Sequence, residues 1–261
     1  MAGRKYNFQM LDHALALYPP GSEERELIGR IDEKRLPAHV AITMDGNGRW
    51  AKAKGLGRNE GHSAGAEAAR EITEVSARLG IRYLTLFTFS SENWKRPASE
   101  VQFLMDMLYE NLLNRQDLLD DNDIRLKIIG DLGKLPGKLR KKLQDSEESS
   151  RRHKRMQVNL ALNYGSRQEI LHAVREIASR GIPVARIDEK LFAGHLYTAG
   201  CPDPDLLIRT SGEQRISNFL LYQIAYSELY FTPILWPDFR AKELFRALIE
   251  YQGRERRFGR I

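Results

Sequence analysis

The chain has 261 residues, of which 42% are hydrophobic and 29% are charged, and this composition excludes an intrinsically disordered protein. Its 41 Lys and Arg residues outnumber its 35 Asp and Glu residues, and the net charge of +6 favours anionic partners such as phosphates, nucleic acid or an anionic membrane surface. The single cysteine, Cys201, excludes an intramolecular disulfide and a multi-cysteine zinc site. Since we find no bilayer-spanning apolar run and no signal peptide, we expect a cytoplasmic protein.

The first 36 residues are expected to form a helical N-terminal extension, and residues 37–261 a single catalytic domain. Leucines spaced as in a short amphipathic helix occupy positions 11–17. A Pro-Pro-Gly sequence ends this helix, and a second, charged helix is expected over 23–34.

An apolar run over 39–44 has the composition of a strand and leads into Asp45-Gly46-Asn47-Gly48-Arg49-Trp50. Asp45 should therefore stand at the carboxyl end of a strand, where open α/β sheets bind their ligands. Its carboxylate suits Mg²⁺, which prefers one or two carboxylates together with substrate phosphates. Gly46 and Gly48 permit positive φ and close approach of the backbone, and Arg49 offers a planar fork to phosphate oxygens. The alternative is an ordinary tight turn, in which Asp45 and Asn47 bond their own backbone.

Strands and helices alternate along the following residues. We expect strands over 83–89, 125–129 and 156–162, and helices over 61–79, 97–113, 136–150 and 167–178. This alternation predicts an α/β fold with a mostly parallel central sheet flanked by helices. The basic cluster at 138–155 contains interspersed acidic residues and is expected to be a solvated helix face.

The helix expected over 97–113 is apolar on more than one face. A stripe at helical spacing is formed by Val101, Leu104, Met105, Leu108 and Leu112. Phe103 and Met107 are also apolar but lie outside this stripe. Such a helix is either buried on two sides or lines an apolar cavity.

Two more polar loops are expected at the same sheet edge as Asp45. The strand over 83–89 leads into a loop whose polar residues could bond phosphates and whose tryptophan offers a flat apolar wall. A later loop carries Arg209, Arg215 and Ser217, and one diphosphate would satisfy both arginines. Each loop could instead be merely solvated. Glu228 lies in an apolar segment, where a carboxylate needs a cationic partner or a metal.

These motifs together resemble the cis-prenyltransferase family, of the undecaprenyl diphosphate synthase type. The resemblance rests on residues 44–50, 89–96, 208–219 and 255–259, in this order, and it extends from about residue 37 to the C-terminus. It implies a homodimeric, Mg²⁺-dependent transferase that adds isopentenyl diphosphate to an allylic diphosphate such as farnesyl diphosphate. The product would be a cis-polyprenyl diphosphate, and its growing tail would occupy an apolar tunnel.

The resemblance also implies a role for each residue that matches a motif. Asp45 is then the catalytic Mg²⁺ ligand, Asn93 assists proton removal, and Glu228 matches a second metal ligand. The residues expected to hold the allylic diphosphate are Gly46, Asn47, Gly48, Arg49, Arg58 and His62, although a lone helical His is more often structural. Further substrate contacts are expected from Trp50, Ser90, Ser91, Glu92, Trp94 and Arg96. Those expected to bind isopentenyl diphosphate are Arg209, Arg215, Ile216 and Ser217.

Two other interpretations stay open. A non-catalytic partner subunit of the same fold would be expected to lack the Asp45 turn or the arginine loop. A basic phosphate- or nucleic-acid-binding α/β protein would need exposed aromatic residues among its basic ones. We therefore expect small-molecule substrates rather than nucleic acid, with peripheral membrane contact as a route for product release. The basic segment at 254–260 is expected to reach the neighbouring subunit of a homodimer.

The strand over 156–162 suggests where the tail would end. Since the phosphate loops follow the carboxyl ends of the strands, the tail must run toward their amino ends. Met156 shares the apolar face with Val158, Leu160 and Leu162 by period-two alternation. We expect Met156 either near the tunnel floor or in the plain core.

Overall fold

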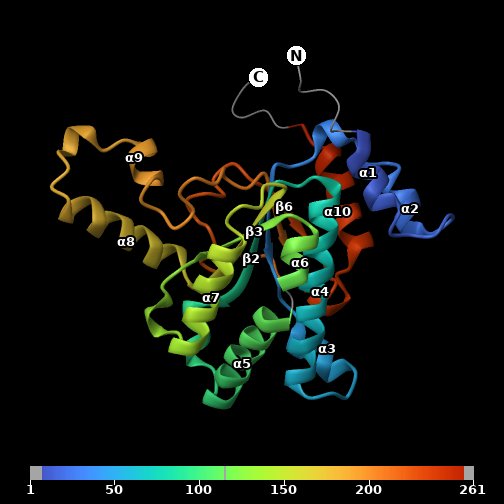
Figure 1. The fold of residues 1–261 in the computed structure, drawn as a ribbon, viewed down its shortest axis with the longest axis horizontal. Helices are drawn as coiled ribbons and strands as arrows, with labels where there is room; N and C mark the ends of the chain where they lie inside the picture. The colour runs from blue at the N-terminus through green and yellow to red at the C-terminus, as the bar shows by residue number, and fades with distance from the viewer. Residues whose placement is uncertain (1–7, 115, 256–261) are drawn as a thin grey trace.

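The computed structural model describes residues 8–114 and 116–255, and a parallel sheet forms its centre (Figure 1). The strands are β1 His39–Thr43, β2 Tyr83–Ser90, β3 Ile124–Ile129, β4 Met156–Tyr164, β5 Leu206–Arg209 and β6 Glu228–Phe231. They lie in the order β3-β4-β2-β1-β5-β6, and each neighbouring pair is parallel. The predicted α/β fold is confirmed. Because all strands are parallel, their carboxyl ends meet at one edge.

Helices precede, connect and follow these strands. Their bounds are α1 Phe8–Leu15, α2 Glu23–Ile28, α3 Asn47–Ala53, α4 Arg58–Leu79, α5 Ala98–Asn114, α6 Gln116–Asp121, α7 Gly137–Ser149, α8 Ser166–Ser179, α9 Glu189–Ala193 and α10 Ala241–Gly253. The predicted long helices agree with α4, α5, α7 and α8 to within a few residues. The charged helix predicted over 23–34 is shorter, because α2 ends at Gly29 and Asp32 caps a separate 3₁₀ turn.

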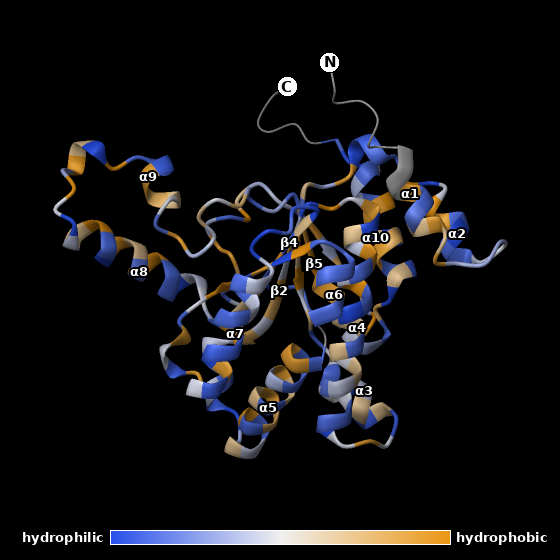
Figure 2. Cartoon of the chain, in the orientation of Figure 1, coloured by the Kyte–Doolittle hydropathy of each residue, from blue (hydrophilic) through white to orange (hydrophobic). Residues whose placement is uncertain are grey.

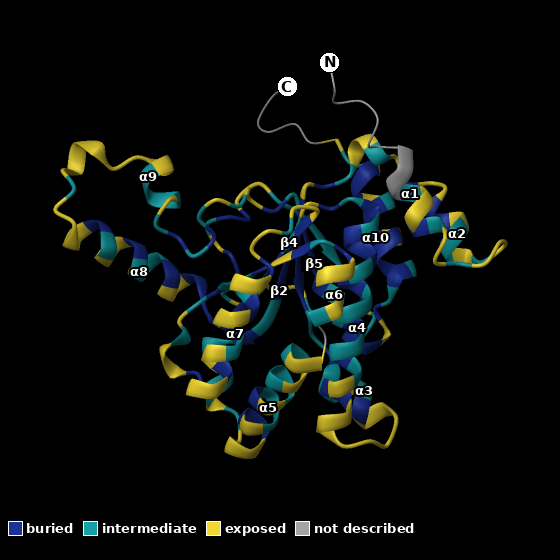
Figure 3. Cartoon of the chain, in the orientation of Figure 1, coloured by how far each residue is buried: buried dark blue, intermediate teal, exposed yellow. Residues whose placement is uncertain are grey.

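Side-chain alternation gives the sheet two differently covered faces. On one face, Ile42 and Leu84 belong to a buried cluster with Ile72 of α4 and Leu244 of α10. On the other face, small residues such as Ala41 and Ala161 lie under Phe219 and its neighbours in the chain. The long helices therefore cover one face, and loops cover most of the other. Figure 3 shows the buried residues concentrated along the strands and α4.

The N-terminal helices pack onto this core. Ala14, Leu27 and Ile28 are buried and belong to the same cluster as the strands of the first face. Helix α1 contacts α4, and α2 contacts α10. The described part of the segment 1–36 thus contributes to the hydrophobic core of the domain.

Helix α7 presents its basic residues to solvent, as predicted. Lys138, Arg140 and Lys141 are exposed, whereas Leu139 and Leu143 are buried against α5. In Figure 2 most residues of this helix have the colour of hydrophilic residues. Among the residues that the structure describes, we find no helix both long and apolar enough to cross a membrane.

Candidate active site

Asp45 lies just beyond β1, at the edge where the strands end. Gly46 follows with φ +115°, and a Cβ there would come within 3.1 Å of Leu235, so only glycine fits this position. Helix α3 begins at Asn47, which leaves the amides of its first turn without helical acceptors. Gly48 lies within that turn and does not use the positive φ that glycine permits.

Two arginines and a threonine surround Asp45. The Nη2 group of Arg209 donates to Asp45 Oδ2 at 3.1 Å, and Arg49 Nη2 lies 3.7 Å from Oδ1. The hydroxyl of Thr210 donates to the Asp45 carbonyl at 2.7 Å and accepts from its amide at 2.9 Å. The backbone of Asp45 is therefore fixed, while its carboxylate stays one-third exposed. A metal ion or a ligand can still reach the carboxylate.

Arg209 is built into the protein rather than solvated. Its side chain is only 4% exposed, and its Nη1 group donates to Ser217 Oγ at 2.8 Å and to the carbonyl of Arg215. Burial lowers the pKa of Arg209, and the neighbouring Asp45 opposes this shift. Its buried Nε has no hydrogen-bond partner within the described residues. Such an orphaned donor beside Asp45 suits an anionic ligand.

A second group of cations converges on Glu100, a residue that the sequence analysis missed. One oxygen of this carboxylate, Oε1, lies 3.0 Å from Arg58 Nε, 2.9 Å from Arg96 Nη1 and 3.3 Å from His62 Nε2. The side chain of Glu100 is 8% exposed. Burial lowers the pKa of His62, and its ring accordingly stays neutral between Glu100 and Asn47 at neutral pH. The structure thus brings Arg58 and His62, both expected at the allylic diphosphate, together with Arg96, which was expected among the further substrate contacts.

The loop after β2 orients the side chain of Asn93. The Ser90 amide donates to Asn93 Oδ1 at 3.0 Å, in a reciprocal capping box at the start of the 3₁₀ helix Ser91–Lys95. A register shift between Phe87 and Phe89 lies just before it, and such bulges re-aim side chains near sites. Asn93 and Ser90 consequently face the same crevice as Asp45.

The two tryptophans expected to flank the substrates face elsewhere. Trp50 donates its Nε1–H to Asp238 at 2.8 Å, and Lys54 lies over its ring. Trp94 donates to Asn163 at 2.8 Å. In the described part of the chain, neither ring lines the crevice or the pocket behind it. Each indole N–H thus has its acceptor outside the crevice.

Glu228 does not accompany Asp45 within this chain. It begins β6, where it pairs with Leu206, whereas Asp45 follows the opposite end of β1. About five residues of strand, roughly 16 Å, separate these levels of the sheet. The carboxylate of Glu228 is bound by Arg254 at 3.0 Å. Within this chain Glu228 therefore lies apart from Asp45, and we find no group of three potential metal-binding side chains among the described residues.

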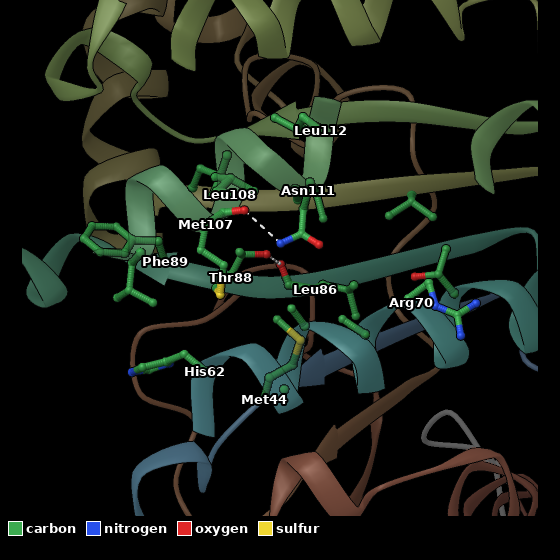
Figure 4. Close-up of a pocket in the computed structure, with 18 of the residues that line it drawn as sticks. Met44, His62, Arg70, Leu86, Thr88, Phe89, Met107, Leu108, Asn111 and Leu112 are labelled. Atoms are coloured by element: carbon green, nitrogen blue, oxygen red, sulfur yellow. Dashed lines mark hydrogen bonds between the residues drawn. The ribbon is translucent and has the colours of Figure 1, made fainter. Parts of the chain in front are cut away.

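The polar residues form one crevice that opens into an apolar pocket. We call the space lined by Asp45, Asn47, Arg58, Ser90, Asn93, Arg96 and Ser217 the polar crevice. The apolar pocket behind it lies between α4 and α5 and is lined by residues such as Leu86, Met105, Met107, Leu108 and Leu112. Figure 4 shows Met107 and Leu108 of α5 facing Met44 and His62 across it.

This pocket explains the apolar surface of α5 and bears on the two alternatives for Met156. Met107, outside the main stripe, lines the pocket, whereas Phe103 is not among the lining residues of the described chain. Val158, Leu160 and Leu162 line it as well. Met156 instead is 1% exposed and belongs to the core cluster. On β4 the lining of the pocket ends at Val158, two residues along the strand from Met156, and this favours the core position for Met156.

Two other arginines of the site, Arg49 and Arg215, form ion pairs with the same carboxylate. Glu213 pairs with Arg49 at 2.8 Å and also with Arg215. Ile216 packs against the cluster around Phe219 on the far face of the sheet. No simple sequence signal identified Glu213 as the partner of Arg49 or Glu100 as the partner of Arg58, because the two members of each pair are distant in the chain.

The fold and the site define an α/β protein with a cation-rich crevice at the sheet edge and an apolar pocket behind it. The family model described as "Putative undecaprenyl diphosphate synthase" matches residues 43–259. The isoprenyl transferase of Heliobacterium mobile is 49% identical over 92% of this chain and 94% of its own length. That of Chlorobaculum tepidum is 52% identical over 86% of both chains.

Solved structures agree with these relatives. Lavandulyl diphosphate synthase from Lavandula x intermedia, in complex with dimethylallyl diphosphate, is 40% identical, with a TM-score of 0.83 over 87% of this chain and 99% of that one. A probable undecaprenyl diphosphate synthase from Campylobacter jejuni is 34% identical, with a TM-score of 0.73 over 86% and 99%. This chain therefore belongs to the isoprenyl transferase, or cis-prenyltransferase, family.

Proposed function

We propose that this protein is a Mg²⁺-dependent cis-prenyl diphosphate synthase. It condenses isopentenyl diphosphate with an allylic diphosphate such as farnesyl diphosphate, and the product is a cis-polyprenyl diphosphate of the undecaprenyl type. The observation that carries this proposal is the shared wall of the two spaces. Met44, Asn47, His62 and Leu104 line both the polar crevice and the apolar pocket, so one substrate can place a diphosphate in the first and its tail in the second.

The residues around Asp45 fit a magnesium ion. The donor set is one partly exposed carboxylate next to cationic side chains that suit phosphates, and Mg²⁺ commonly completes its shell with phosphate oxygens and water. Asp45 would hold the ion. When bound, Mg²⁺ supplies neutralising charge for the departing diphosphate. Glu228, the expected second metal ligand, lies too far from Asp45 in this chain to hold the same ion.

The chain's own side chains account for binding and charge stabilisation. Arg49, Arg58 and the amides at the start of α3 would hold the allylic diphosphate, with Arg96 beside them. Arg209, Arg215 and Ser217 would hold isopentenyl diphosphate. Diphosphate oxygens would compete with Glu100 and Glu213 for these guanidinium groups, which are already placed to face developing negative charge.

The reaction forms one carbon–carbon bond and breaks one carbon–oxygen bond. The alkene of isopentenyl diphosphate attacks the allylic carbon, the allylic diphosphate leaves, and a proton is then lost. Asn93 would assist that loss, since the Ser90 amide already fixes its carboxamide in the crevice. The lengthening tail would advance into the apolar pocket, which we propose as the entrance of a substrate tunnel.

We further propose a homodimer that contacts membrane surfaces when it releases long products. Helices α8 and α9 extend away from the sheet (Figure 1). Exposed apolar residues on α8 and the following segments include Leu171, Val174, Leu221 and Tyr226. Such a patch suits a second copy of the chain. Arg257 and Gly259, expected to reach the partner, lie outside the described residues. A Leu171→Glu, Val174→Glu variant that keeps the molar mass of the wild type in light scattering would contradict this interface.

The function is tested by incubating the protein with Mg²⁺, farnesyl diphosphate and labelled isopentenyl diphosphate, followed by chromatography of the products. We expect labelled chains several isoprene units longer than the primer. No incorporation with any C5 to C20 allylic primer would contradict the proposal. Oligonucleotide binding that weakens steeply with salt would instead favour the nucleic-acid alternative.

A further inference from the structure

Asn218 connects three loops at the sheet edge. It directly follows Ser217, which bonds the buried Arg209. Its Nδ2 group donates to Glu92 Oε1 at 3.0 Å, in the loop after β2, and to Gln168 Oε1 at 3.1 Å, in α8. Its Oδ1 and carbonyl oxygens accept the amides of Arg167 and Ser166 at 2.9 and 2.8 Å and so cap α8.

The backbone at this position is held in an uncommon conformation. Ser217 and Asn218 have φ of +54° and +61°, which places two successive residues in the left-handed region. Asparagine tolerates this region better than most residues, but each such residue still costs free energy. The bonds from Asn218 to its neighbours offset that cost and therefore specify the shape of the loop.

Gly165 shows how closely the three loops approach. A Cβ added there would lie 2.3 Å from Gln168 Oε1 and 2.7 Å from both Asn218 Nδ2 and Ser91 Oγ. The loop after β2, the loop after β5 and the start of α8 thus meet around a position without space for a methyl group. Relative movement of the loops would disturb this packing.

The hydrogen bond between Asn218 and Glu92 joins the two loops that line the polar crevice, the loop after β5 and the loop after β2. Glu92 adjoins Asn93, and Asn218 adjoins Ser217; all four line the crevice. Burial alone would raise the pKa of Glu92. Hydrogen bonds to its carboxylate, of which the one from Asn218 has the largest effect, outweigh burial and keep the pKa below its usual range. Glu92 is accordingly an ionised acceptor that cannot replace the donor.

We propose that Asn218 is a positioning residue. Through its hydrogen bond to Glu92, it fixes the loop after β5, which carries Ser217, relative to the loop after β2, which carries Asn93. The inference rests on the proposed function. It assigns Asn218 no contact with substrate. Because a misplacement of about 1 Å between reacting groups can cost about 100-fold in rate, loss of this bond should act on kcat more than on KM.

A reversal of the hydrogen bond tests the proposal. Asn218→Asp keeps the Oδ1 acceptor for Arg167 and tolerates positive φ, but it sets two carboxylates against each other. Glu92→Gln then supplies the missing donor, and Gln168 can rotate its amide to donate as well. We expect Asn218→Asp to lower kcat at least tenfold relative to the wild type when Glu92 is intact, but less than threefold relative to the single Glu92→Gln variant when the two changes are combined, with each KM within threefold of the same reference.

Two further measurements keep the result decisive. Asn218→Gly retains the backbone conformation but removes the side chain, so Glu92→Gln should not rescue it. Amide hydrogen exchange over 90–96 and 211–220 should rise in both loops in Asn218→Asp and return in the double variant. Equal kcat losses from Asn218→Asp with and without Glu92→Gln, or exchange that changes in 211–220 alone, would overturn the proposal. If the wild type makes no product, the proposed function fails, while hydrogen exchange still tests the link between the loops.

Discussion

Replacement of Arg209 by alanine should destabilise the protein, whereas the same replacement of Arg215 should not. The Arg209 side chain is 4% exposed and bonds both Asp45 and Ser217. Removing one partner of a buried pair costs about 3–5 kcal/mol, and since Asp45 is one-third exposed we expect about 3 kcal/mol. The Arg215 side chain is 59% exposed and pairs with Glu213, and such surface pairs contribute about 0–1 kcal/mol.

Thermal unfolding and steady-state kinetics check this difference. For a domain of this size about 1 kcal/mol corresponds to roughly 2–4 °C, so Arg209→Ala should melt about 6–12 °C lower and Arg215→Ala within about 4 °C of the wild type. Both should raise the KM for isopentenyl diphosphate roughly tenfold or more, as expected for a lost charge-assisted contact. Equal melting temperatures would refute the claim that Arg209 is part of the fold. A rise confined to the allylic KM would show that the two sites are reversed.

Three other predictions concern metal binding, pH and product length. Asp45→Ala should lose about 100-fold or more in kcat, and it should also lower the melting temperature because it leaves the buried Arg209 without its carboxylate; near wild-type turnover at saturating Mg²⁺ would exclude Asp45 as the metal ligand. Burial lowers the pKa of His39 to about 4, so the unfolded chain takes up a proton that the folded chain does not. The free energy of unfolding should therefore fall by about 3 kcal/mol between pH 6.5 and 4, and His39→Asn should flatten this slope in urea titrations. Leu119→Ala, in the lining of the apolar pocket, should lengthen the products, whereas Met156→Ala should only destabilise the core by about 2–5 kcal/mol; longer products from Met156→Ala would contradict the pocket boundary.

The sequence was informative where local pattern and chemistry agree. The apolar run before Asp45 predicts a strand, and alternation with helices predicts parallel strands, so the position of Asp45 at the sheet edge follows. Met107, apolar outside the stripe of its helix, indicated that α5 is either buried on two sides or lines a cavity, and the structure places Met107 in the pocket lining. These inferences depend on residues near one another in the chain.

Contacts between distant segments could not be predicted in this way. Glu100 and Asn218 acquire their roles from partners on other elements, 42 and 126 positions away in the pairs with Arg58 and Glu92. The separation of Glu228 from Asp45 depends on the register of β6 against β5, which no local pattern specifies.

A crystal structure with Mg²⁺ and an unreactive thio analogue of farnesyl diphosphate tests the central claim most directly. We predict that the diphosphate lies in the polar crevice, between Asp45 and Arg58. The farnesyl tail should pass Met44 and extend between α4 and α5 against Leu108. A diphosphate bound on the basic surface of α7, or a tail that leaves the apolar pocket empty, would contradict the account.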